Sequence, residues 1–198
     1  MKKLFALFKD GHTNYFTTNH GSMGDIFEAK ELCEKYGIRC LAGLEGYIVP
    51  NPLEKDKSNY HIIVIPRTNR ARRKLNKISS RANVDGYYYK PRIFPGDLLE
   101  LDKNDVYITT ACCAGLLRDE ISFEKLFIPL YKHFKESILL EVQTHAVDIQ
   151  KDINRKCLEL RSKYGLRLRF FIGEVRTFLI SELTSFFVVL SSIINILP

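Results

Sequence analysis

The sequence predicts an α/β domain built on a parallel sheet that is either open or closed into a barrel. Short apolar runs typical of strands alternate with longer runs of helical period at least four times along the chain. The run "YHIIVIP" at 60–66 is apolar over most of its length, as expected for a strand buried on both faces. The chain contains neither internal repeats nor a linker-like tract, which favours one domain.

The expected elements have recognisable ends. Apolar residues recur at helical spacing over 25–36, and Gly37 follows, as a glycine commonly does after a helix. Thr68 caps a helix that runs to about Ala82, with an apolar face inward and a basic face outward. Gly165 ends a third long helix. The expected strands are 14–18, 38–42, 60–66, 106–110, 138–142 and 166–171, the expected helices 25–36, 68–82, 122–134 and 148–164, and 51–59 is expected to be an exposed loop.

Composition places the chain among ordinary globular proteins. It has 198 residues, of which 45% are hydrophobic and 27% charged, and this excludes a disordered chain. The net charge of +7 is concentrated in residues 67–92, where nine basic residues and one acid give +8. Such a block suits a polyanion or an acidic partner surface, and a merely solvated helix face remains the alternative.

The cysteines and the two termini bear on location. Five cysteines without a CxxC pair, and an N-terminus that lacks the pattern of a signal peptide, favour reduced thiols in a cytoplasmic protein. Residues 183–198 carry no charge, but these 16 residues fall just short of the length that spans a bilayer. We therefore expect no membrane association, and a tail anchor is the alternative.

Residues that can bind metals follow several expected strands. His20 and Glu45 come after the first and second strands, Cys112 after the fourth and His145 after the fifth, whereas His61 lies near the start of the third. Polar groups at the carboxyl ends of strands are where α/β folds collect their chemistry, and this donor set suits zinc. Each residue also has an ordinary structural explanation: a hydrogen-bonded histidine, a surface glutamate, a buried cysteine or an exposed loop histidine.

The stretch "DGYYYKPRI" at 85–93 carries a different pattern. Its three tyrosines beside Lys90 and Arg92 could stack on bases and pair with phosphate. The alternative is a turn whose tyrosines pack on the domain and whose arginine binds a carboxylate.

Four segments together resemble a known family. The set is similar to the PHP (polymerase and histidinol phosphatase) domain at the N-terminus of the alpha subunit of bacterial DNA polymerase III, over about residues 9–168. The resemblance implies a distorted seven-stranded β/α barrel with a metal cluster at its strand ends, in which His20, Glu45, His61 and Cys112, and more weakly His145, are ligands. In the wider family the cluster hydrolyses phosphoesters; in replicative polymerases it proofreads or braces the polymerase. The segments are "GHTNYFTTNHGSMGDIFEA", "YGIRCLAGLEGYI", "YHIIVIPRTNRARRKLNKISSRANVDGYYYKPRI" and "TTACCAGLL".

The chain departs from this family at three places. It lacks the His-x-His motif of a preceding strand, it has Asn19 where the family has Asp, and no Asp-x-His motif follows 166–171. We therefore expect an incomplete distorted (β/α)7 barrel, with a partial PHP domain at 1–168 and an apolar tail of unknown origin at 169–198. The cofactor expected is zinc or manganese with an incomplete ligand set, and no small-molecule cofactor is expected.

The leading functional hypothesis is a fragment of the PHP domain of a DNA polymerase III alpha-like subunit, involved in DNA replication. Its parent family is a nucleotidyltransferase, but the fragment would not polymerise DNA alone. Alternatives are a metal-dependent phosphoesterase, a membrane-tethered remnant, and a non-catalytic module that binds DNA or other replication subunits. The residues expected to contact nucleic acid or phosphate are Arg72, Arg73, Lys74, Lys90 and Arg92.

Overall fold

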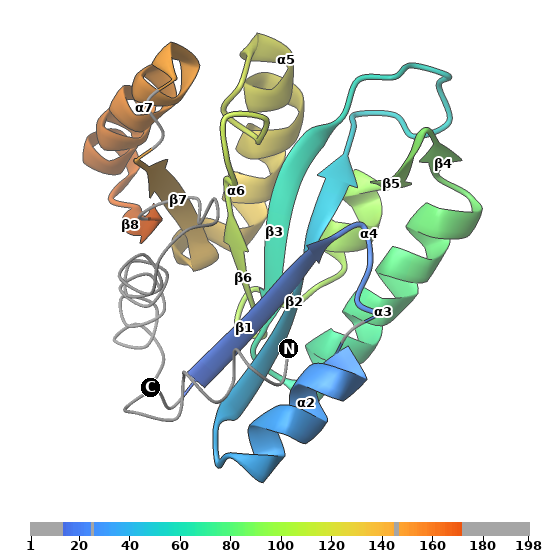
Figure 1. Ribbon diagram of the computed structural model, residues 1–198. Coiled ribbons are helices and arrows are strands. Elements are labelled where there is room, and N and C mark those ends of the chain that lie inside the picture. The colour runs from blue at the N-terminus through green and yellow to red at the C-terminus, as the bar shows by residue number, and fades with distance from the viewer. Residues whose placement is uncertain (1–13, 25, 145–146, 172–198) are drawn as a thin grey trace.

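A computed structural model describes residues 14–24, 26–144 and 147–171 (Figure 1). A mixed sheet forms its centre, and helices cover one side of that sheet. No helix within these ranges is both long and apolar enough to cross a bilayer, and the apolar segment 183–198 lies outside them. The strands are β1 (Asn14–His20), β2 (Arg39–Ile48), β3 (Tyr60–Pro66), β4 (Tyr87–Tyr88), β5 (Lys90–Ile93), β6 (Val106–Thr109), β7 (Ile138–Gln143) and β8 (Arg167–Phe171).

Helices or helical turns follow most of the strands. The helix α3 begins where expected: Thr68 is its N-cap, and the Thr68 hydroxyl accepts a hydrogen bond from the Ala71 N–H at 3.1 Å. The helix α7 ends at Gly165, which has a φ of 67°. The helical elements are α2 (Ile26–Lys35), α3 (Asn69–Val84), α4 (Pro95–Leu99), α5 (Glu120–Ser122), the π-helical turn η1 (Phe123–Phe127), α6 (Ile128–Phe134), the 3₁₀ turn η2 (Lys135–Ser137) and α7 (Asp148–Tyr164).

The sheet is mixed, which corrects the expectation of a parallel one. Its order is β4-β5-β2-β3-β6-β7-β8, and β1 pairs with the first part of β2. Strand β3 runs antiparallel to both of its neighbours, β2 and β6. The reason is local: residues 49–59 join β2 to β3 without a helix, and a parallel return needs a longer crossover. The start of β3 therefore lies at the same edge of the sheet as the ends of β1, β2 and β6.

The described pairings form an open sheet, because none of them joins β8 to β1. The fold is thus a mixed α/β arrangement, and closure into an incomplete barrel remains a prediction. The β4–β5 hairpin is not among the expected strands, since its strands are too short to show a period of two.

The core confirms that β3 is buried on both faces. Ile62 and Val64 belong to the main core between the sheet and its helices. Ile63 and Ile65 belong to a smaller cluster on the opposite face, with Tyr107, Ala111 and Leu139. Alternation along the strand sends successive side chains to the two faces, and here both faces are apolar.

Candidate metal centre

Three elements of the sheet bring His20, Glu45 and His61 together. His20 is the last residue of β1 and lies directly opposite Glu45 of β2. Two residues further along β2, Tyr47 lies opposite His61 of β3. Because β3 is antiparallel, His61 near its start reaches the same edge as His20 at the end of β1. One nitrogen or oxygen atom from each of the three residues lies within 4.8 Å of the others.

Glu45 lies between the two imidazoles. Its Oε1 is 3.1 Å from His61 Nδ1, and its Oε2 is 3.7 Å from His20 Nε2. Cys112 approaches from the turn after β6, with its Sγ 3.4 Å from the same His61 Nδ1. The His20 side chain is 56% exposed, whereas those of Glu45 and His61 are 17% and 18% exposed. The cluster is therefore enclosed on the Glu45 and His61 side and open to solvent at His20.

Two turns hold the outer members in place. Gly21, directly after His20, has a φ of 65°, and its N–H donates to the Glu45 carbonyl at 2.8 Å. A Cβ at this position would lie 2.7 Å from Pro91 Cγ, so a glycine is required there. The turn after β6 is tied to β3, because the His61 N–H donates to the Ala114 carbonyl at 2.9 Å. The Ala114 N–H in turn donates to Cys112 Sγ at 3.4 Å, which fixes the thiol beside His61.

The separations between donor atoms fit a single tetrahedral cation. Ligand atoms lie about 2.0–2.3 Å from zinc, so neighbouring ligand atoms in such a site are about 3.4–3.6 Å apart. The distances from His61 Nδ1 to the Glu45 carboxylate and to the Cys112 sulfur are 3.1 and 3.4 Å. Small side-chain adjustments would therefore let these groups share one ion, and His20 would be a further ligand on the open side.

The groups around His61 favour positive charge on its imidazole. Hydrogen bonds to the Cys112 sulfur and the Glu45 carboxylate raise the pKa of His61 from 6.5 to about 9, although its burial lowers the pKa. The same two groups would attract a metal cation to this position. The other predicted ligand, His145, lies outside the described residues.

The predicted phosphate contacts do not form one surface. Arg92 is 3% exposed, and its guanidinium donates to the carbonyls of Pro52, Glu54, Asp56 and Gly86. This corrects the expectation that Arg92 contacts phosphate, because all of these bonds are internal. The alternative, in which Arg92 binds a carboxylate, is also not what the structure shows, because the acceptors are backbone carbonyl oxygens.

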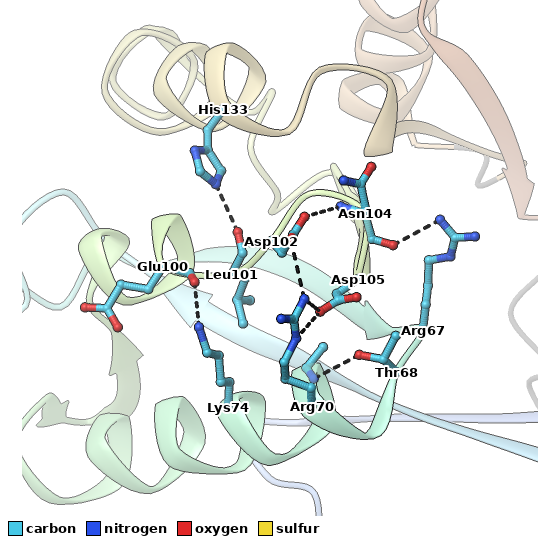
Figure 2. A network of polar contacts seen from close by, with 11 residues as sticks. Arg67, Thr68, Arg70, Lys74, Glu100, Leu101, Asp102, Asn104, Asp105 and His133 are labelled. Carbon is cyan, nitrogen blue, oxygen red and sulfur yellow. Dashed lines mark hydrogen bonds and ion pairs between the residues drawn. The ribbon is translucent and has the colours of Figure 1, made fainter.

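Two basic residues of α3, Arg70 and Lys74, hold the 100–105 segment (Figure 2). Arg70 pairs with Asp105 at 2.6 Å and with Asp102 at 3.4 Å. Lys74 donates to the Glu100 carbonyl at 2.9 Å, and Figure 2 shows the two residues facing each other. Of the other predicted contacts on this helix, Arg72 donates to Asn69 at 3.4 Å and Arg73 is exposed.

Sequence analysis missed the role of Tyr47. Its ring centroid lies 5.8 Å from that of His20 and 5.3 Å from that of His61. The Lys90 Nζ lies 5.1 Å from the Tyr47 ring centroid, which places a cation beside the cluster. The motif "GLEGY" contained the necessary information, because residues two apart on a strand share a face. Tyr47 thus follows Glu45 on the side of the metal cluster.

A second polar cluster was also missed. Glu141 on β7 is 1% exposed and pairs with Arg169 on β8 at 3.3 Å. It also accepts hydrogen bonds from the Thr109 hydroxyl and the Gln143 amide, both at 2.7 Å. The sequence places these residues on separate strands, so only the sheet order brings them together.

The fold agrees with the chain's relatives. The sequence profile of the PHP domain matches residues 4–145, and the chain belongs to that family. A solved structure of a candidate metal-dependent phosphoesterase from Bifidobacterium adolescentis has the same fold. Its TM-score is 0.56 at 11% identity, with 85% of this chain and 80% of that chain covered.

Similar sequences are alpha subunits of DNA polymerase III, which confirms the resemblance to that subunit. The DNA polymerase III subunit alpha of Treponema pallidum is 28% identical over 167 residues, which is 76% of this chain and 14% of the relative. The same subunit of Aquifex aeolicus is 26% identical over 168 residues, with the same coverage. This chain therefore spans about one seventh of the length of these relatives.

Proposed function

We propose that this chain is a metal-binding PHP domain of a DNA polymerase III alpha-like protein and acts in DNA replication. The observation that carries the proposal is the convergence of His20, Glu45 and His61 on one point, with Cys112 beside them. The ion is zinc or manganese, which accept imidazole and carboxylate ligands. DNA and other replication subunits are the partners, in keeping with the polymerase subunits that the chain resembles. The matched segment alone is not expected to polymerise DNA.

Phosphoester hydrolysis is the second candidate function. Two histidines and one carboxylate are three protein ligands, and a site of this kind leaves a coordination position open for chemistry. The exposure of His20 puts that position on the solvent side. A bound cation would polarise a phosphoryl oxygen. Glu45 and His61 would hold the ion, and Lys90 beside Tyr47 would bind a phosphate anion near it.

Cys112 distinguishes the two functions. If its thiolate is a fourth ligand, the site is closed and structural; if it only hydrogen-bonds to His61, the site stays open. Cobalt(II) in place of the native metal reports this directly, because a thiolate ligand gives a strong near-ultraviolet charge-transfer band. A band that disappears in Cys112→Ser identifies the closed site, and a spectrum that Cys112→Ser leaves unchanged identifies the open one.

Metal analysis of the full chain tests the proposal. We expect about one zinc or manganese per chain after dialysis, and its loss in Glu45→Gln. Loss of a residue that only hydrogen-bonds to a metal ligand lowers metal affinity roughly 10- to 100-fold. Loss of the ligand Glu45 should lower metal affinity by more than this. Glu54→Gln, which removes an exposed loop carboxylate, is the matched control and should keep the metal. Metal-free protein, or equal loss in both variants, would refute the metal centre.

A further inference from the structure

The β4–β5 hairpin exposes two aromatic rings next to the metal centre. Tyr87 is 61% exposed and Tyr89 is 60% exposed, although large aromatic side chains usually bury most of their surface. Between the two, Tyr88 is half-buried, and the Arg92 guanidinium lies 5.2 Å from its ring centroid. The hairpin therefore has one ring that packs on the domain and two rings that face solvent.

The conformation at the tip keeps one of these rings outside. Tyr89 has a φ of 58°, in the left-handed region that tyrosine seldom adopts. The Lys57 Nζ lies 4.5 Å from its ring centroid, so the ring is paired with a cation from the 51–59 loop. Strained backbone of this kind is concentrated at binding and catalytic sites, where the surrounding structure holds it.

The hairpin contacts residues that adjoin the metal centre. Pro91 packs against Gly21, the residue that follows the ligand His20. Lys90 lies over Tyr47, whose ring stacks on the His20 imidazole. A chain of contacts thus runs from the exposed tyrosines through Lys90 to the cluster. A phosphate held by Lys90 would lie near Tyr47, whose ring adjoins His20.

The hairpin is also fastened to the 51–59 loop by internal hydrogen bonds. The Arg92 guanidinium fastens it to the 51–59 loop through the carbonyls of Pro52, Glu54 and Asp56, at 2.6, 2.8 and 3.0 Å. Because the backbone is already fixed, binding to the exposed rings would cost little further ordering. The basic face of α3 offers less to a ligand, since its Arg70 and Lys74 are engaged with the 100–105 segment.

The geometry points to the β4–β5 hairpin as a binding surface for single-stranded nucleic acid that leads into the metal centre. Unpaired bases stack on exposed aromatic rings, and their backbone phosphates pair with adjacent lysines. Tyr87 and Tyr89 supply the rings, and Lys57 and Lys90 supply the cations. The delivery of a strand to the metal rests on the proposed function, whereas the binding itself needs no metal.

Fluorescence anisotropy with the full chain and a labelled 15-nucleotide oligo(dT) tests the inference, in buffer containing EDTA so that metal plays no part. Tyr87→Ser combined with Tyr89→Asn should weaken binding about tenfold or more, since each ring is one stacking platform. Asparagine is chosen at position 89 because it tolerates a positive φ. Lys90→Gln should lower the slope of log affinity against log salt by about 0.7, as expected for one phosphate contact.

Lys77→Gln is the matched control, because it removes an exposed lysine from α3 without touching the hairpin. It should leave affinity within about twofold of the wild type. The inference is overturned if the wild type prefers duplex DNA, if the double tyrosine variant binds as well as the wild type, or if Lys77→Gln weakens binding as much as Lys90→Gln does. Oligo(rU) in a parallel titration distinguishes an RNA strand from a DNA strand. If the metal analysis finds no bound metal while oligo(dT) binding is retained, the metal centre is refuted and the hairpin surface stands.

Discussion

Arg92 offers the sharpest test of how this fold is held together, and the perturbation is Arg92→Met. The side chain is 3% exposed and donates to four backbone carbonyls, one at Gly86 and three in the 51–59 loop. Methionine keeps much of the volume and removes every donor. The loop carbonyls then lose their partners, and the hairpin loses its attachment to the loop that leads into β3.

The magnitude follows from these bonds. A hydrogen bond from a charged donor contributes about 1.5–3 kcal/mol, but contributions to one side chain are not additive and freed loop carbonyls can regain water. We therefore expect Arg92→Met to lower the free energy of unfolding by about 3–4 kcal/mol. The free energy of unfolding of a domain is about 5–15 kcal/mol, so the variant should still fold but with low stability. Urea unfolding followed by circular dichroism measures the loss.

Two further variants make this test specific. Arg92→Lys keeps the charge but cannot reach four carbonyls at once, so its loss should be intermediate. Lys77→Met on the exposed face of α3 should change the free energy of unfolding by about 0.5 kcal/mol or less. If Arg92→Met lies within about 1 kcal/mol of the wild type, the internal bonds are not what holds the hairpin, and the reasoning fails.

Three other predictions follow from the buried and titrating groups. Zinc affinity should rise about tenfold per pH unit between about pH 7 and 9, because a proton must leave His61, whose pKa is about 9; chelator competition that shows no pH dependence would contradict this. Arg169→Met should lower the free energy of unfolding in urea by about 3–5 kcal/mol, because it leaves the buried Glu141 carboxylate without its cation. The double variant Arg169→Met/Glu141→Leu should regain most of that stability. Equal losses in the single and double variants would refute the pairing. Burial raises the pKa of the Asp119 carboxyl, but hydrogen bonds from the Ser122 N–H and its other partners outweigh this and lower it. Asp119→Ala should thus lower the free energy of unfolding by about 1 kcal/mol at pH 7. This loss should become smaller as the pH falls below about 4, and a loss that becomes larger there would contradict the role of Asp119 as a cap.

The features that the sequence determined are those that depend on local pattern. The cap at Thr68, the inward face of α3 and the burial of β3 on both faces follow from residue type and spacing. The residues of the candidate metal centre could also be selected, because they are of metal-ligand types and lie near the ends of strands. Periodicity reports which faces are buried, and burial is what these predictions require.

Tertiary structure decided the rest. Periodicity is the same for parallel and antiparallel strands, so the reversal of β3, which brings His61 to His20, could not be seen in it. The roles of basic residues depended on partners far along the chain: Arg92 meets carbonyls about 40 residues away, and Arg70 meets Asp105. The sequence does not show which partner a charged residue has, because the partner is brought to it only by the fold. The same residue type can therefore be exposed to solvent at one position and buried in internal hydrogen bonds at another.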